Sequence, residues 1–434
     1  MNRKGICAWP AGWAKKDGDE KRVLLLTAAN FLPIYGAVAA LACMALWLLI
    51  SKKAVPMVTS VKGGRLMLLA AGLSVAVSAI RGNLMGCAIG CGMAALFLVG
   101  MYLRRVMTRR LFEKAAALCC HMSLICFAVA VVEVAVMGGD HRAVSTFHNA
   151  NYYAAAAETV ALLSLYKMLR KKGTRRAYYG GVCAANMAAL ALTGCRTGIL
   201  VLLAALPVML LLLGHRKALR WYLLLGGGCV AAFLLLPGLF PRAEELLEDF
   251  GKRYSIWKTA VLGIRSAPVF GLGGDGYSLI HQALGGHPAP HAHNILLDGV
   301  LNFGFVGVAL MVPGALALLH RAGEVYARRN DRPRMALLFS VLTAVFIHGM
   351  TDITAFWPQT GFLVLLCLAG VGIYEPRSAC QEQTVWVEAP IRKAAFKGCT
   401  TLLGMRICRV SLRLKWASVE VEDPRMWKLL AATR

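Results

Sequence analysis

The sequence predicts an all-α polytopic membrane protein, and three observations carry that prediction. Hydrophobic residues make up 58% of the chain and charged residues only 16%, with a mean hydropathy of +0.60, which lies outside the usual soluble range. Long apolar runs recur, and a helix needs roughly 20 residues to cross a hydrocarbon core. The runs are continuous, whereas barrel strands would alternate over about ten residues. We therefore expect about 11 or 12 transmembrane helices.

Eleven apolar runs are candidate spans. They form a membrane domain over residues 23–374, between a basic N-terminal segment (1–22) and a basic tail (375–434) that we expect in the cytoplasm, along the inner membrane surface. The candidate spans are residues 23–50, 66–80, 84–103, 115–138, 151–166, 178–194, 198–214, 222–240, 295–319, 335–351 and 358–374.

Basic residues predict the orientation, because Lys and Arg collect in cytoplasmic loops. The loops at residues 51–65, 104–114, 167–177, 215–221 and 320–334 carry 4, 5, 6, 3 and 5 of them, whereas the short loops on the other side carry one or none. This places residues 241–294 outside the cytoplasm. It also places residues 1–22 outside although they hold six Lys or Arg, and that conflict indicates a missing or wrongly bounded span near the start.

The net charge of +26 does not indicate nucleic acid, because the basic residues are spread over many loops instead of forming one module. We expect them to set the topology and to contact anionic membrane lipids. The fourteen cysteines fall mostly in predicted helices, where free Cys behaves as a small hydrophobe, and they indicate no disulfide framework.

The large extracytoplasmic loop, residues 241–294, is far longer than the roughly 15 residues beyond which a loop usually has its own structure or function. Apolar residues at steps of three and four predict an amphipathic helix in it. Two arginines on or near its polar side are candidates for phosphate binding, because guanidinium forks hold phosphate oxygens in pairs. The alternative is an interfacial helix with solvated charges. The arginines are Arg253 and Arg265, and the apolar face is Leu247, Phe250, Tyr254, Trp257, Val261 and Ile264.

Gly271, Gly273 and Gly276 after this helix match the spacing G-x-G-x-x-G. A dinucleotide site needs a strand before such glycines, a helix after them and a βαβ unit around them. The sequence predicts no such unit. We therefore interpret the glycines as a turn that returns the chain to the membrane.

The stretch HPAPHAHN contains His287, His291 and His293, which allow three interpretations. A Zn²⁺ site is disfavoured, because Pro288 and Pro290 prevent a helix and no Cys or carboxylate lies within the stretch. A purely structural histidine is the second interpretation. The third is acid–base catalysis, which suits imidazole because its pKa is near working pH, and we favour it for His293.

Other polar residues lie at predicted outer helix ends. Arg196 precedes the seventh span, where it is either a functional group or an arginine snorkelling to the interface. His148 and Asn151 open the fifth span, and His348 and Asp352 close the tenth. Because several separate helix ends and loops offer polar groups to one surface, the sequence predicts a site there.

These residues resemble the signature of the O-antigen ligase and O-antigen polymerase superfamily. His293 is followed by Asn294, nine residues, Gly304, two residues and the small Gly307. Arg196 of CRTGIL is followed four positions later by leucine, and FHNANYYA, RYSIW with SAPVFGLGGDGY, and HGMTD are also similar to the family. The similar blocks run from about residue 145 to 374.

The resemblance implies a GT-C-like membrane glycosyltransferase in the bacterial cytoplasmic membrane, with its active site on the extracytoplasmic face. Such an enzyme moves a glycan from a polyprenyl-diphosphate donor to a hydroxyl of a glycan, lipid or wall-polymer acceptor, without a nucleotide sugar, cofactor or metal. Ligases and polymerases share the pattern. By position, His293 is the expected base. The expected substrate-binding residues are Arg196, Arg253, Arg265, Asn294, Asn151 and Asp352.

Two other classes of protein remain open. A transporter or flippase of lipid-linked glycans would also place arginines near a diphosphate, but transporters often show internal repeats, which we do not find, and transport gives His293 no role as a base. A structural or assembly partner would leave the external histidine and arginines unexplained.

Overall fold

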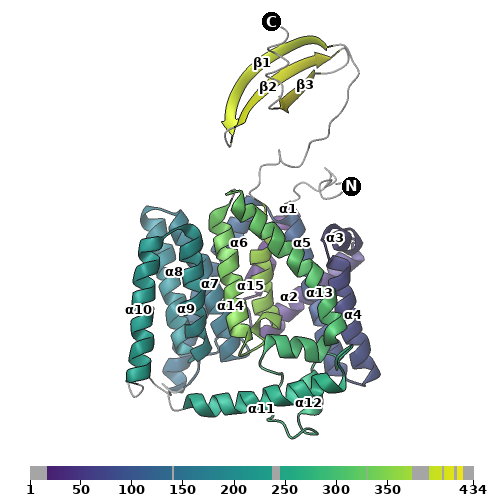
Figure 1. Cartoon of the computed structure of the whole chain (residues 1–434), viewed down its shortest axis with the longest axis vertical. Coiled ribbons are helices and arrows are strands. Elements are labelled where there is room, and N and C mark those ends of the chain that lie inside the picture. Colours follow the sequence, from purple (N-terminus) through teal and green to yellow (C-terminus); the bar gives the residue numbers. More distant parts are fainter. Residues whose placement is uncertain are drawn as a thin grey trace. The chain divides into compact units, whose positions relative to one another are not determined.

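The structure, a computed structural model, describes residues 17–138, 141–236, 245–329, 331–373, 391–402, 405–414 and 418–423. The chain forms two compact units, Trp9–Glu375 and Met1–Ala8 with Pro376–Arg434. In the larger unit the described elements are helical (Figure 1). They are α1 (Asp17–Ala29), α2 (Ile34–Ile50), α3 (Ala54–Ser60), α4 (Gly64–Ile80), α5 (Leu84–Val106), α6 (Arg109–Met137), α7 (Ala150–Arg170), α8 (Gly173–Leu192), α9 (Arg196–Leu213), α10 (Arg216–Leu235), α11 (Glu245–Ser266), α12 (Gly276–Ile280), α13 (Ile295–Ala327), α14 (Arg332–Gly349), the 3-10 helix η3 (Thr354–Phe356) and α15 (Pro358–Ala369).

The smaller unit contains three strands that the sequence analysis did not predict. They are β1 (Ile391–Leu402), β2 (Met405–Leu414) and β3 (Ser418–Asp423), paired antiparallel in the order β1-β2-β3. The stretch RVSLRL in β2 alternates polar and apolar residues, the period of a strand with two different faces. The helical prediction therefore holds for the larger unit and not for the tail.

Several helices of the larger unit are candidate membrane spans. By length and composition, α5, α6, α9 and α13 qualify among the described residues, and α2 with α3, bent by 97°, adds a fifth if the pair is one span. This is fewer than the eleven predicted. The helices α4 and α15 have only 17 and 12 residues, and the polar residues Asn151 and Glu158 reduce the hydropathy of α7. The chain is a multi-pass membrane protein; its GT-C likeness stays a prediction.

The predicted first span, residues 23–50, is wrong as one helix. The chain leaves the helical path after α1 and resumes it at Ile34, directly after Pro33. Proline has no N–H to donate and disfavours helical geometry in the residue before it, which makes this a favourable place for the chain to leave the helix. In the gap, the Asn30 amide donates to the Gln359 carbonyl over 2.9 Å, which anchors the turn between α1 and α2.

The two helices α1 and α2 run antiparallel. The Arg22 guanidinium, early in α1, lies 4.1 Å from the ring centre of Trp47, late in α2. Asp19 accepts a hydrogen bond from the Tyr102 hydroxyl over 3.0 Å, close to the basic loop 104–114. The chain therefore enters α1 at the end of the unit that carries the basic loops, here called the basic end. Helix α1 has only 13 residues and is not among the candidate spans, but the hairpin places its start, with Lys21 and Arg22, on the side of the basic loops.

Helix α13 is broken inside the family signature. Gly304 has φ 62° and ψ 178°, and a Cβ at this position would lie 2.3 Å from the Val269 carbonyl oxygen. The returning loop fills the break, because Phe305 N–H donates to Pro268 and Leu272 N–H donates to Leu301, over 2.9 and 2.8 Å. The glycine-rich stretch is thus a turn against a helix, as predicted.

The predicted amphipathic helix is confirmed as α11. Figure 1 shows α11 lying across the end of the helical unit, beside α12. The side chains of Ile256 and Ala260 are buried against Leu272 and Leu301. Phe250 and Tyr254 of the predicted apolar face are 58% and 62% exposed, so only part of that face packs against the protein. Close packing on α13 involves Gly263, where a Cβ would lie 2.7 Å from the Leu301 side chain.

Candidate functional site

The predicted site residues gather where several chain segments end, at the end of the unit opposite the basic end. Asn151 lies in the first turn of α7 and Arg196 begins α9. His293 precedes α13, and Asp352 follows α14. Helix α11 lies across this end (Figure 1). We call this group of residues the far-end site.

The centre of the far-end site is the carboxylate of Asp352, which is 2% exposed. Its Oδ2 accepts from the Asn151 amide over 2.7 Å, and its Oδ1 accepts from the Ile353 N–H over 2.7 Å. Oδ1 also lies 3.4 Å from His291 Nε2 and 3.5 Å from His293 Nδ1. Burial raises the pKa of Asp352, but hydrogen bonding and charge from His293, His291 and Asn151 outweigh it and hold the pKa well below its usual range.

His291 is held neutral beside this carboxylate. Burial lowers the pKa of His291 to about 4, with Asp352 opposing the change and His293 adding to it. The Nδ1 atom accepts from the His293 backbone N–H over 3.3 Å, which assigns the proton to Nε2. Nε2 lies 3.4 Å from Asp352 Oδ1 and 3.3 Å from the Tyr152 hydroxyl. His291 Nε2 therefore hydrogen-bonds the Tyr152 hydroxyl and lies close to the carboxylate of Asp352.

His293 is the more accessible histidine, with its side chain 24% exposed. Its backbone has φ 47°, a left-handed conformation that non-glycine residues rarely adopt and that functional sites often hold. The Trp257 indole donates to its carbonyl over 3.4 Å. Among the described residues, none contacts Nε2 through a hydrogen bond. With Nδ1 turned to Asp352, Nε2 is the atom that can take a proton.

Asn294 caps α13. Its side-chain oxygen accepts from the N–H groups of Leu296 and Leu297 over 3.0 and 3.1 Å, as an N-cap does. Its amide donates to the Met350 carbonyl over 3.2 Å, which joins the start of α13 to the end of α14. This capping role explains why an amide side chain directly follows His293. Direct contact between Asn294 and the substrate stays a prediction.

Asn151 is part of a chain of polar contacts that ends at Asp352. Arg142 donates to Asn151 Oδ1 over 2.8 Å and to the Thr193 carbonyl over 2.9 Å. The sequence analysis did not select Arg142. The signal that could have found it is its position as the one Lys or Arg in residues 139–150, on the side where basic residues are rare.

One face of α11 connects Arg196 to His293. Arg196 Nη2 lies 3.2 Å from Asp249 Oδ2, and Arg253 follows Asp249 by four residues, so both are on the same side of α11. Trp257, four residues further, contacts the His293 carbonyl. Arg253 therefore lies between the two contacts, on the face that joins the arginine to the histidine.

Arg265 is separate from this face. It lies in the last turn of α11 and is exposed. Twelve residues separate it from Arg253, which is about 18 Å along a helix. Arg253 thus lies on the side of α11 that contacts Arg196, and Arg265 lies at the other end of the helix.

The three histidines of this stretch lie in two different environments. His287 lies in an exposed segment, where its Nδ1 contacts the Pro288 carbonyl over 2.9 Å. His291, His293 and Asp352 offer three ligand atoms within 4.8 Å of one another, a group that could hold a metal ion. The stretch HPAPHAHN contains no carboxylate. The carboxylate of this group belongs to Asp352, which follows α14. The expectation of a metal-free site stays a prediction.

Tyr152 and Trp357, two aromatic residues beside the carboxylate, were not selected in the sequence analysis, whereas His148 was. The Tyr152 ring is stacked on Trp357 with centroids 4.4 Å apart, and His148 is stacked on Trp357 at 5.5 Å. The rings come from the start of α7 and the segment before α15, so no local motif links them. They close the side of the site next to His291.

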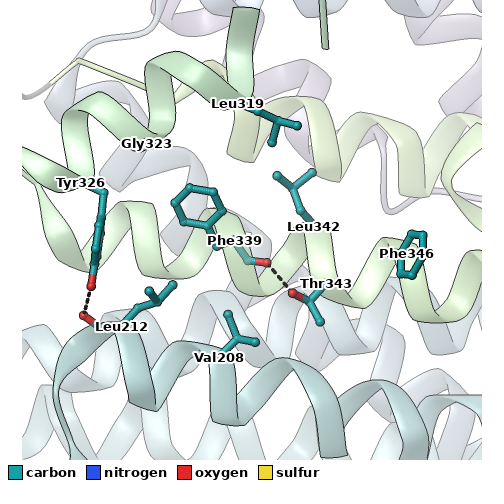
Figure 2. Close-up of a pocket in the computed structure, with 9 residues that line it drawn as sticks. All are labelled: Val208, Leu212, Leu319, Gly323, Tyr326, Phe339, Leu342, Thr343 and Phe346. Carbon is teal, nitrogen blue, oxygen red and sulfur yellow. Dashed lines mark hydrogen bonds between the residues drawn. The ribbon is translucent and has the colours of Figure 1, made fainter. Parts of the chain in front are cut away.

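An apolar groove lies between α9, α13 and α14, with a volume of about 600 Å³. Figure 2 shows side chains of these three helices facing the space, and the Tyr326 hydroxyl donating to the Leu212 carbonyl over 3.0 Å. Leu212 and Tyr326 are each one residue from the basic-end terminus of their helix. The lining residues are Val208, Leu212, Leu319, Gly323, Tyr326, Phe339, Leu342, Thr343 and Phe346.

Comparison with known proteins identifies one family. Residues 181–312 match the family described as O-antigen ligase, a range that includes Arg196, Arg253 and His293 but neither Asn151 nor Asp352. No curated protein matches the chain. Residues 181–312 are therefore similar to the O-antigen ligase family, in agreement with the resemblance seen in the sequence.

Proposed function

We propose that this membrane protein is a glycosyltransferase that moves a glycan from a polyprenyl-diphosphate donor to an acceptor hydroxyl on the extracytoplasmic face. The family match supports the class, because O-antigen ligases transfer glycans. The observation that carries the proposal is the ionised carboxylate of Asp352 beside His293, with His291 held neutral against the same oxygen. That arrangement leaves one histidine to act as a base.

His293 would take the acceptor proton. As the acceptor oxygen forms its bond to the anomeric carbon, the proton moves to Nε2 of His293, and the bond from that carbon to the diphosphate breaks with its electron pair leaving on the diphosphate. Asp352 stabilises the imidazolium that forms. The 3.5 Å between Nδ1 and Oδ1 is long for a hydrogen bond, and such contacts often tighten only when substrate is bound.

Arg196 and Arg253 would bind the diphosphate, which gains negative charge as it leaves. A guanidinium suits this task because its fork holds two oxygens at once. Arg196 lies 3.2 Å from the Asp249 carboxylate, an anion in the place where a phosphate oxygen would enter. Arg265 has less support, because it is exposed and remote from these two residues.

The isoprenoid tail of the donor would lie in the apolar groove between α9, α13 and α14 (Figure 2). Helix α9 begins at Arg196 and lines the groove from Val208 onward, about 18 Å along the helix. One helix can thus contact the diphosphate at its start and the tail further on. The donor already contains a good leaving group, so the reaction needs no nucleotide sugar.

The test is a reconstitution of the parent protein in vesicles with a polyprenyl-diphosphate glycan and a panel of acceptors: a lipid core, a wall polymer and a second glycan repeat. Product with the diphosphate donor, and none with a monophosphate-linked control, supports the proposal. The productive acceptor separates ligase from polymerase. Transbilayer movement of the donor without product with any acceptor would instead support a flippase.

A further inference from the structure

A buried pair of ionisable side chains lies between the helices that carry the far-end site. His348 Nδ1, in the last turn of α14, is 3.1 Å from both carboxylate oxygens of Glu158 in α7. Their side chains are 1% and 2% exposed. Burying an ionisable residue is costly unless it is paired, and the proposed reaction uses neither residue.

Glu158 lies directly beneath the first turn of α9. A Cβ at Gly198 would be 2.9 Å from Glu158 Oε1, so the absence of a side chain there lets α9 approach the carboxylate. The start of a helix carries partial positive charge and favours a nearby anion. Arg196 is two residues before Gly198, in the same turn. Glu158 therefore supports the element that holds Arg196.

His348 supports the other part of the site. Its carbonyl accepts from the N–H groups of Thr351 and Asp352, each over 3.0 Å, and these bonds form the turn that places the Asp352 carboxylate. The Thr351 and Thr197 hydroxyls are 2.9 Å apart, which ties this turn to α9 next to Arg196. The helices α7, α9 and α14 lie side by side (Figure 1).

We propose that Glu158 and His348 are positioning residues that fix the distance between the base, His293 with Asp352, and the diphosphate-binding Arg196. This inference rests on the proposed function and adds two residues to it. The contact between Glu158 and His348 joins the helix start that holds Arg196 to the turn that holds Asp352. A displacement of about 1 Å between reacting groups can lower a rate by roughly 100-fold, so a buried contact far from the substrate can control turnover.

The first experiment compares Glu158→Gln and His348→Gln with the parent in the reconstituted transfer assay. Each variant keeps a polar side chain but removes the ion pair. We expect kcat to fall roughly 10- to 100-fold while the KM for donor stays within about threefold, because binding groups remain. Glu158→Asp, which keeps the charge, should recover part of the rate.

The matched control is Glu113→Gln. Glu113 accepts from Lys167 over 2.7 Å and from Tyr166 over 2.8 Å, and both partners lie in α7, the helix of Glu158, near the basic end. Loss of this pair should leave kcat near the parent value. An equal loss of kcat in Glu113→Gln and Glu158→Gln would overturn the proposal, because it would show general destabilisation of α7.

A second measurement reports the position of α9 relative to the turn after α14 and does not require glycan transfer. Thr197→Cys with Thr351→Cys places two thiols where the hydroxyls are 2.9 Å apart, and mapping the linked peptides by mass spectrometry reports disulfide formation between them. We expect rapid formation with Glu158 present and slower formation with Glu158→Gln. An unchanged rate would overturn the positioning role. If the parent transfers no glycan but Glu158→Gln slows this disulfide, the proposed function fails and the positioning contact stands.

Discussion

The carboxylate of Asp352 lies 3.5 Å from Nδ1 of His293, although the two residues belong to segments on either side of the α13–α14 pair. The same oxygen lies 3.4 Å from His291, so one buried anion faces two imidazoles. Burial keeps His291 neutral, and the proposed function assigns the proton to the more accessible His293.

The first prediction concerns the charge of Asp352. Asp352→Asn keeps the size of the side chain but removes the charge that stabilises imidazolium, so we expect kcat for glycan transfer to fall about 10³-fold. Steady-state kinetics of protein in vesicles, normalised to inserted protein, measures this loss. A kcat equal to that of the parent would show that the carboxylate has no part in the reaction.

The second prediction compares two arginines of the far end. Arg196→Lys replaces a fork by a point charge beside the proposed diphosphate, and we expect kcat/KM for the donor to fall at least roughly tenfold. Arg265→Lys, an exposed and remote site, is the matched control and should change kcat/KM much less. Equal effects of the two substitutions would remove Arg196 from the diphosphate site.

The third prediction is a pH dependence of stability due to His291. A depression of its pKa from 6.5 to about 4 means that protonation favours the unfolded chain and corresponds to about 3 kcal/mol. The stability contribution is therefore complete above pH 6.5 and is lost as the pH falls toward 4. Unfolding temperatures in detergent across this range should show a smaller decrease for His291→Gln than for the parent, while the exposed-segment control His287→Gln behaves like the parent. Identical curves for all three proteins would exclude the effect.

The fourth prediction concerns metal. His291, His293 and Asp352 have the spacing of a metal site, but in the proposed reaction their atoms serve proton transfer. Transfer should therefore continue unchanged after treatment with a chelator. Loss of activity that Zn²⁺ restores would replace the base by a metal-bound nucleophile.

Much of the fold and part of the site could be predicted from the sequence. Apolar runs indicated most of the helices, because a helix that crosses a lipid bilayer needs about 20 mainly apolar residues. The placement of Arg196, His293 and Asp352 at outer helix ends indicated one site, since the topology brings these ends together. The hairpin at Pro33 was missed because residues 23–50 form one nearly continuous apolar run, and the packing of α11 on α13 was not predicted because Ala260 counts little in a hydrophobic pattern.

Other features depend on three-dimensional contacts that no local pattern contains. Glu158 and His348 lie 190 residues apart in the sequence, and their pairing appears only once α7 and α14 lie together. Asp352 was predicted to bind substrate, but its burial favours a role through the histidines. Gly304 was identified by the family signature. The break that it allows in α13 could not be predicted, because the break is stabilised by hydrogen bonds from the loop that returns to α13.

The most direct test of the central claim is glycan transfer by His293→Ala in vesicles, beside the parent and His287→Ala. The account predicts that His293→Ala inserts and unfolds like the parent but transfers glycan at least roughly 10²- to 10⁴-fold more slowly, while His287→Ala keeps the parent rate. Transfer by His293→Ala at the parent rate would contradict the assignment of this histidine as the base.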